Sequence, residues 1–165
     1  MNLWEKIRHI RPTRLIQFGI IFLKRPLLLV PVWKATKGTL KVCDRLYGNL
    51  HHGTGKANAF RHAFWNYQLC QKTLKITRDK QKSVNFTQKL VDFYEKAAKT
   101  KWLDQAMDLH NNAIGRAYFL LHFDKNDREI TYLMQKLAEN AKKVGKIEEI
   151  QTYHNALVYL NDEPC

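Results

Sequence analysis

A short stretch of the chain, residues 107–116, brings together side chains that could carry out acid–base chemistry. It reads Met-Asp-Leu-His-Asn-Asn-Ala-Ile-Gly-Arg. On a helix, with about 100° between successive residues, Asp108, Asn111, Asn112 and Gly115 share one face. Asn is a poor helix former, so an Asp and two Asn on one face predict a buried polar network rather than a solvated surface. Such a network is either catalytic or structural, and the sequence leaves both interpretations open.

A second set of polar residues, on an earlier predicted helix, includes Arg61 and His62. Antiparallel packing of the two helices would place His62 opposite Asp108, with Arg61, Asn111 and Asn112 nearby. A histidine bonded to a carboxylate is a common general-base arrangement, in which the acid fixes the tautomer of the ring. Amide groups can orient a water molecule or stabilise an oxyanion. These five residues are therefore candidate catalytic residues.

Glu95 is a further candidate, as a second acid. Together with Asp108 it could also bind a hard divalent cation such as calcium or magnesium. The structural alternatives are that His62 is a hydrogen-bonded core histidine and that Asp108 pairs with Arg61 or Arg116. His110 faces the apolar side of its helix and is expected to be structural. The sequence contains no Gly-x-Ser-x-Gly or His-Glu-x-x-His motif, which gives serine hydrolases and zincins little support.

The positive charge of the protein is unevenly distributed. The net charge is +13, and residues 1–101 carry 21 Lys and Arg against 5 Asp and Glu, whereas residues 102–165 carry 7 against 10. This basic field favours polyanionic partners, either nucleic acid or an anionic membrane surface. A basic surface that is merely solvated is the alternative. The sequence does not indicate the oligomeric state.

Residues 15–33 are apolar but interrupted by Lys24 and Arg25. Each charge would cost about 2.5–3.5 kcal/mol at the centre of a bilayer, and two prolines would disrupt the helix, so a spanning segment is not expected. No small-x-small cleavage site follows, and no cleavable signal peptide is recognised. We therefore expect a protein that is cytoplasmic or peripheral on the membrane.

The N-terminal arm, residues 1–50, is instead predicted to contact a membrane surface. Aromatic residues including Phe18 and Phe22 would lie among the headgroups, and basic residues would bind phosphates. The residues expected at this surface are Arg8, Arg11, Arg14, Lys24, Arg25 and Trp33. In the alternative interpretation, the arm packs its apolar side chains onto the core of the following domain.

The three cysteines Cys43, Cys70 and Cys165 have no Cys-x-x-Cys spacing and no histidine at zinc-ligand spacing. They predict buried thiols in a reducing compartment, and no zinc-finger or nucleotide-binding motif is present. Residues 34–55 resemble a flexible polar connection that ends in His51-His52-Gly53. This histidine pair could bind a metal, although loop histidines of this kind are usually solvated.

Apolar spacing predicts four helices in the remaining chain. They cover residues 57–75, 87–100, 103–123 and 127–144, with a polar loop or helix cap at 78–85. The last helix is expected to begin after Asp127 as N-cap and to stop at Gly145. Residues 157–160 fit either a short strand or a fifth helix. The predicted fold is mainly α, a single compact helical bundle (51–165) preceded by the basic, apolar arm (1–50).

Three motifs carry a resemblance to a known family. They are Asn-Ala-Phe-Arg-His-Ala-Phe-Trp (58–65), Asp-Phe-Tyr-Glu (92–95) and the stretch 107–116. They resemble an uncharacterised bacterial family with the pattern Arg-His-Ala-x-Trp, Asp-x-His-Glu and Met-Asp-x-x-Asn-Asn-x-x-Gly, found alone and at the ends of secreted or polymorphic-toxin proteins. Tyr94 departs from this pattern, which weakens a metal-ligand role there. The resemblance implies a helical domain and suggests a toxin-like hydrolase.

Three functions remain as hypotheses. The first is a hydrolase that uses His62, Asp108 and the two asparagines, with membrane lipid as the favoured substrate. The second is a metal-dependent nuclease or nucleic-acid-binding protein, although His-Asn-Asn is predicted on a helix and not in the hairpin of the His-Asn-His nucleases. The third is a non-catalytic, membrane-associated module in which the polar network only specifies the fold.

Overall fold

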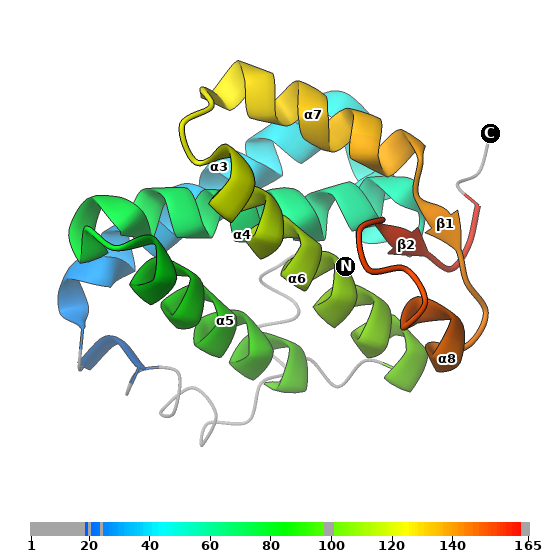
Figure 1. Cartoon of the computed structure of the whole chain (residues 1–165), viewed down its shortest axis with the longest axis horizontal. Helices are drawn as coiled ribbons and strands as arrows, with labels where there is room; N and C mark the ends of the chain where they lie inside the picture. The colour runs from blue at the N-terminus through cyan, green and yellow to red at the C-terminus, as the bar shows by residue number, and fades with distance from the viewer. Residues whose placement is uncertain (1–18, 20, 24, 98–100, 163–165) are drawn as a thin grey trace.

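The computed structural model describes residues 19, 21–23, 25–97 and 101–162 (Figure 1). Over these residues the chain is mainly α-helical and forms one helical bundle, which confirms the predicted fold class. None of the helices in this part of the chain combines the length and apolar composition that a membrane crossing requires.

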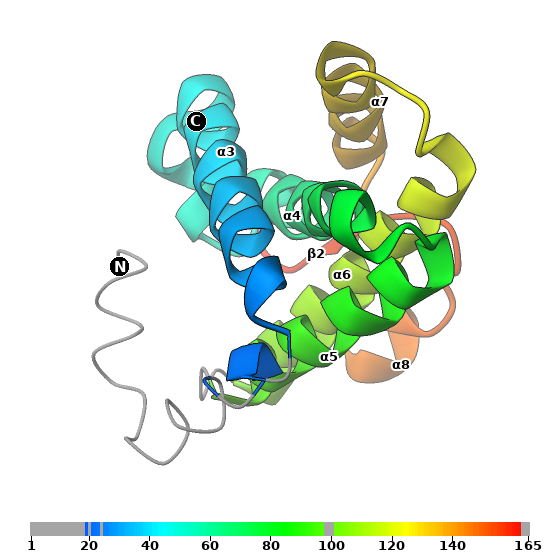
Figure 2. The same cartoon turned by 90° about the vertical axis from the view of Figure 1, so that its left-hand side faces the viewer.

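Helix α4 (Lys56–Thr77) lies at the centre of the bundle (Figures 1 and 2). It contacts α3 (Leu29–Tyr47) on one side and α5 (Lys80–Ala97) and α6 (Trp102–His122) on another, and α7 (Asp127–Glu139) also packs on it. Because α4 is surrounded in this way, its polar residues are buried as well as its apolar ones. The central helix therefore positions the residues of the polar network.

Shorter elements complete the fold. A parallel two-stranded sheet pairs Lys142 with Val158 and Lys143 with Tyr159. The short elements are η1 (Pro26–Leu28), η2 (Gly48–His52), β1 (Lys142–Lys143), α8 (Ile147–Ile150) and β2 (Val158–Tyr159). Of the two structures expected for residues 157–160, the short strand is therefore confirmed.

A glycine fixes the spacing between α4 and α6. A Cβ atom at Gly115 would lie 2.1 Å from the carbonyl oxygen of Ala63, which is far inside contact distance. Any side chain at this position would push the two helices apart. This close crossing at Gly115 brings the polar faces of α4 and α6 together.

The segment before α3 and the first turns of α3 pack partly on the core. Phe22, Leu28 and Val32 are buried against Leu69, Leu90 and neighbouring residues. The prediction that Phe22 lies among lipid headgroups is therefore wrong, because its ring packs edge-on against Phe86 at 6.3 Å between centroids. Other apolar side chains of this segment are exposed, namely Leu23, Leu27, Leu29, Val30 and Trp33.

The connection predicted for residues 34–55 is wrong because most of it forms helix, and the segment 78–85 is also largely helical. Within residues 34–55, α3 continues to Tyr47 and buries Val32, Ala35, Thr39 and Cys43, which recur at helical spacing. Residues 78–85, predicted as a polar loop or a helix cap, contain the cap and the first turns of α5, so the loop is wrong and the helix cap is confirmed. This helix begins early because the Asp79 side chain accepts a hydrogen bond from the backbone nitrogen of Lys82 at 2.7 Å and so caps the helix.

The boundaries of α7 also differ from the prediction. Its N-cap is Asn126 rather than Asp127, in a capping box with Glu129. The helix ends at Glu139 rather than continuing to Val144, because Lys142 and Lys143 pair with β2. The sequence of residues 140–144 did not predict that Lys142 and Lys143 form a strand.

Candidate active site

Three helices bring three titratable side chains together. His62 from α4, Glu95 from α5 and Asp108 from α6 are all buried. The His62 Nε2 atom lies 3.2 Å from the Asp108 Oδ1 atom, and the His62 Nδ1 atom lies 3.6 Å from the Glu95 Oε1 atom. The predicted juxtaposition of His62 and Asp108 is therefore confirmed, and Glu95 approaches the opposite edge of the ring.

A chain of buried hydrogen bonds supports this group from behind. Arg116 donates to Asn66 Oδ1 at 2.9 Å, Asn66 Nδ2 donates to Asn112 Oδ1 at 2.6 Å, and Asn112 Nδ2 donates to Glu95 Oε1 at 3.1 Å. An arginine can only donate and a carboxylate can only accept. Arg116 at one end of this hydrogen-bonded series and Glu95 at the other therefore fix the orientation of the Asn66 and Asn112 amides.

This orientation assigns the two nitrogens of His62. The Nδ1 atom lies 3.2 Å from Asn112 Oδ1, an acceptor, so Nδ1 carries a proton. The Nε2 atom lies 2.8 Å from Arg61 Nη2, which can only donate, so Nε2 is the basic nitrogen. With Asp108 on its other side, Nε2 lies between a donor and an acceptor. This is the environment of a nitrogen that can gain and lose a proton.

Burial shifts the pKa values of two side chains near the network. It lowers the pKa of Arg116 from its usual value, an effect that Asp92 partly offsets. Burial also raises the pKa of Tyr94 to about 12, and the neighbouring Glu95 carboxylate adds to this rise. Tyr94 is therefore a neutral phenol at physiological pH.

A small cleft of about 50 Å³ reaches His62 from the surface. Its volume admits a few water molecules. The Thr39 hydroxyl is buried and has no hydrogen-bond partner within the described chain, while Trp65 donates to Thr36 at 3.0 Å. The cleft is lined by Thr36, Thr39, Leu40, Arg61, His62, Trp65 and Tyr94. A larger groove of about 650 Å³, between α3 and α7, is lined by none of the three titratable residues.

Asn111 lies outside the group, contrary to its expected place beside His62. Its side chain donates to the carbonyl of Val158 and accepts from the Val158 nitrogen, both at 2.9 Å. Neighbouring residues of a helix differ by about 100° in direction, so Asn111 and Asn112 face different partners. His110 bonds the carbonyl of Ala156 at 2.8 Å, which agrees with the predicted structural role.

The predicted membrane-contact residues are only partly described. Arg8, Arg11, Arg14 and Lys24, like Phe18, lie outside the described residues. Arg25 and Trp33 are exposed, which agrees with a surface position. Whether they touch a membrane stays a prediction.

Sequence reasoning missed Asn66, which links Arg116 to Asn112. Its position four residues after His62 on α4 was an available signal, because such residues are neighbours on a helix. Thr39 was missed because its segment was interpreted as a connection. Tyr94 drew attention only as a departure from a motif.

Two groups among the described residues have the composition of a metal site. In the first, His62, Glu95 and Asp108 each offer one ligand atom, and these atoms lie within 4.8 Å of one another. The two carboxylates approach different ring nitrogens, which fits a hydrogen-bonded relay better than one shared ion. The second group consists of Asp44, His51 and His52.

Residues 19–142 match the family model DUF6973, described as a domain of unknown function. The chain belongs to the DUF6973 family. All three motifs lie within the matched residues, so the expected membership of an uncharacterised family is confirmed. Searches of curated proteins and of solved structures found no match.

Proposed function

We propose that this DUF6973 protein is a hydrolase in which His62 is the general base. The observation that supports it is the protonation assigned to the ring of His62, a residue that lines the cleft. Asn112 accepts from Nδ1, and the basic Nε2 lies between Arg61 and Asp108. A base must have a fixed orientation, access to a water molecule and a group that stabilises its charged form. His62 has all three.

In the proposed reaction, Nε2 takes a proton from a water molecule in the cleft as that water attacks an ester. The resulting imidazolium lies between the Asp108 and Glu95 carboxylates, which stabilise its charge. Nε2 then returns the proton to the leaving oxygen, so the base is regenerated. Asn112 and Glu95 keep the ring in place on the Nδ1 side.

Arg61 favours a substrate with negative charge. In the structure its guanidinium donates to Nε2 at 2.8 Å and so occupies the lone pair of the base. An anionic group in the cleft would compete for the guanidinium, because charge-assisted hydrogen bonds are the stronger ones. Binding of a phosphate or carboxylate group would thus free Nε2 and place the substrate beside it.

Anionic lipid is the substrate class we favour, since exposed apolar side chains lie just before and on α3, the helix that also lines the cleft. Leu23, Leu27, Val30 and Trp33 are each more than half exposed, and Arg25 and Lys34 lie among them. Apolar side chains with flanking cations are typical of peripheral membrane contact. Trp33 is three residues before Thr36, a cleft residue, on α3. A membrane bound at this surface would therefore lie close to His62.

Purified protein would be assayed for release of fatty acid or headgroup from phosphatidylglycerol vesicles, with phosphatidylcholine vesicles as the uncharged comparison. We expect His62→Gln and Asp108→Asn to lower kcat at least 100-fold while far-UV circular dichroism shows the helices intact. Asp104→Asn, half-buried one turn earlier on α6, is the matched control. Equal rates for Asp108→Asn and Asp104→Asn would contradict the proposal.

Arg61→Gln tests the substrate charge. It should raise KM for an anionic ester and leave hydrolysis of a neutral ester unchanged or faster, because Nε2 is then free. For the membrane surface, Trp33→Ala should weaken vesicle flotation, whereas Trp102→Ala, which removes a tryptophan that is 83% exposed, should not. Equal binding of these two variants would remove the membrane role and leave the hydrolase proposal to be tested on soluble esters.

A toxin-like role has its own readout. Expression of the wild type in a bacterial host should arrest growth, and Asp108→Asn at the same soluble level should not. If neither arrests growth and no ester is cleaved, the network is better explained as a device that specifies the fold.

A metal-dependent nuclease is the second candidate, because His62, Glu95 and Asp108 offer ligand atoms within 4.8 Å of one another. It would cleave RNA or DNA only with a divalent cation, and its binding would weaken steeply with added salt. Activity that survives a chelator would exclude the metal-dependent nuclease, and His62 acting as a base without metal would remain.

A further inference from the structure

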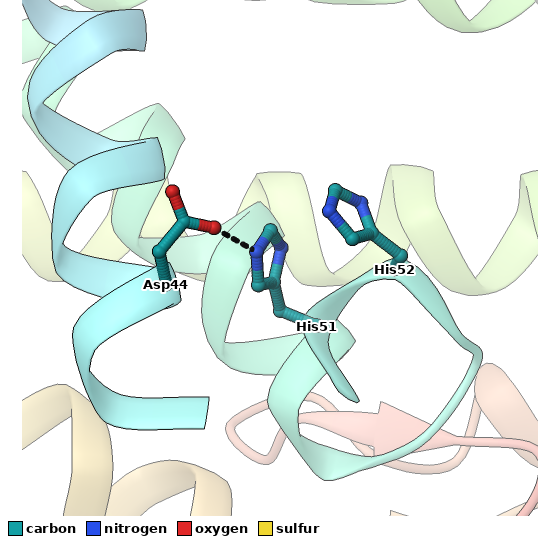
Figure 3. Close-up of side chains that lie close together, drawn as sticks. All are labelled: Asp44, His51 and His52. Atoms are coloured by element: carbon teal, nitrogen blue, oxygen red, sulfur yellow. Dashed lines mark hydrogen bonds and ion pairs between the residues drawn. The ribbon is translucent and has the colours of Figure 1, made fainter. Parts of the chain in front are cut away.

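Outside the candidate active site, a second histidine is buried with an incomplete set of partners. His51, at the end of η2, is 0% exposed. Its Nε2 atom lies 2.8 Å from Asp44 Oδ1, on α3, and its Nδ1 atom has no hydrogen-bond partner within the described chain. The ring of His52 lies next to it, with 4.0 Å between the centroids (Figure 3).

The contact with Asp44 determines which nitrogen of His51 is free. An ionised carboxylate only accepts, so Nε2 is the protonated nitrogen and Nδ1 keeps its lone pair. Figure 3 shows this second nitrogen on the side of the ring turned toward His52. A buried lone pair without a donor is uncommon in folded proteins and calls for a partner beyond the described residues.

We propose that Asp44, His51 and His52 form a binding site for a divalent transition-metal ion of the zinc, cobalt or nickel type. Each residue offers one ligand atom, and these three atoms lie within 4.8 Å of one another. Two imidazoles and one carboxylate are a ligand set that these metals accept, and water would fill the remaining positions.

The carboxylate of Asp44 is the group of the site that favours a cation. Arg61 is the nearby positive charge and Asp44 the nearby negative one. The Asp44 side chain is 64% exposed, so its carboxylate can turn either to the metal directly or to the Nε2 proton of His51. In both positions it favours binding, either as a ligand or by orienting the histidine.

The site is separate from the proposed hydrolase. It uses α3 and η2, whereas His62, Glu95 and Asp108 come from α4, α5 and α6. Its metal is expected to hold α3 and η2 together as a structural ion. The inference therefore does not depend on any activity at His62.

The test is metal binding by the full chain after treatment with a chelator. Co²⁺ would be titrated and followed by its visible absorption, and Zn²⁺ binding would be measured by calorimetry. We expect one equivalent to bind to the wild type, with an affinity at least ten-fold lower for His52→Ala and for Asp44→Asn. Zn²⁺ should also raise the melting temperature of the wild type more than that of either variant.

Matched controls separate this site from other ligands. His154→Ala and Asp124→Asn remove an exposed histidine and an exposed carboxylate outside the cluster, and they should bind as the wild type does. Both test variants change half-buried or exposed side chains, so they should fold, as circular dichroism would verify.

Two results would overturn the proposal. The first is a wild type that binds no Co²⁺ or Zn²⁺. The second is a His52→Ala variant that binds as tightly as His154→Ala. Binding that survives in His52→Ala but is lost in Asp108→Asn would move the metal to the cluster around His62 instead.

Discussion

Two histidines of this molecule are almost equally buried but differ in what surrounds them. His62 has polar neighbours at both ring nitrogens, contributed by α4, α5 and α6. His51 has one bonded nitrogen, whose partner Asp44 is largely exposed, and one nitrogen with no partner in the described chain. The described residues complete the first environment, whereas the second needs a partner beyond them. Burial alone therefore does not indicate what a histidine does.

The difference originates in how the surrounding helices are held. Around His62, α4 and α6 meet at Gly115 with no space between their backbones. Around His51, the partner sits near the end of α3, next to the short turn η2. We expect changes near His62 to disturb the fold strongly and changes near His51 to disturb it little.

The largest effect is expected for Gly115→Ala. The added Cβ would lie 2.1 Å from the Ala63 carbonyl oxygen, so α4 and α6 must separate and His62 must move away from Asp108. We expect a loss of about 3 kcal/mol or more in the free energy of unfolding, the upper part of the range for overpacking. Urea denaturation followed by circular dichroism would measure it.

Gly38→Ala is the control from the helix that carries Asp44. A Cβ at Gly38 meets nothing within 4 Å, and this glycine lies inside α3. Here the change should stabilise the protein by about 0.5–1 kcal/mol, because Ala is the better helix former. Similar destabilisation by both variants would remove the contrast between the two regions.

The second largest effect is expected for Asn112→Ala. This amide contacts His62, Asn66 and Glu95, so its loss leaves several buried polar groups with fewer partners. We expect the free energy of unfolding to fall by about 2–3 kcal/mol. Asn85→Ala removes an exposed asparagine of α5 and should change it by less than about 0.5 kcal/mol. A near-neutral Asn112→Ala would mean that the network contributes little to the fold.

The sequence predicted only part of the environment of His62. Residues 107–116 and Arg61–His62 predicted that His62 and Asp108 meet, because helical spacing and the glycine both favoured this packing. The directions of Asn111 and Asn112 could not be predicted, since only the position of β2 decides which amide meets Val158. Asn66 escaped notice because α4 is buried on most sides, so its sequence shows little contrast between polar and apolar faces.

The region of His51 was harder to predict. Lysines, threonines and Gly38 hid the helical spacing of the buried α3 residues, and two adjacent histidines before a glycine are typical of a solvated loop. Burial of His51 comes from the packing of η2 on α3 and α4, a contact between elements that local sequence does not encode.

A smaller effect is expected on the pH dependence of stability, through the phenol of Tyr94. The pKa of Tyr94 is raised to about 12, first by burial and then by the Glu95 carboxylate, from an ordinary value of 10.0. The folded state therefore keeps the phenol proton that the unfolded state releases above pH 10. This contribution is fully present below pH 10 and is lost as the pH rises toward 12, by about 1 kcal/mol at pH 11.

Tyr94→Phe lacks this ionisation, so its unfolding free energy should fall less than that of the wild type between pH 9 and pH 11. Urea denaturation at both pH values would measure the difference. Ultraviolet titration of the folded proteins should show one tyrosine fewer ionising near pH 12 in the variant, where Tyr67, whose pKa burial also raises to about 12, still titrates. Parallel pH dependence of the two proteins would mean that Tyr94 is not shielded beside a charged Glu95.

The smallest effect is expected for Asp44→Asn, measured in the presence of a chelator. The carboxylate is 64% exposed and stays hydrated, and an asparagine oxygen can still accept from His51 Nε2. The free energy of unfolding should therefore change by less than about 1 kcal/mol. A loss above about 2 kcal/mol would show that His51 needs the negative charge of Asp44, as a positively charged ring would. Its Nδ1 would then carry a proton instead of a lone pair. The two histidines would differ less than their contacts indicate, and the proposed metal site would lose its central ligand.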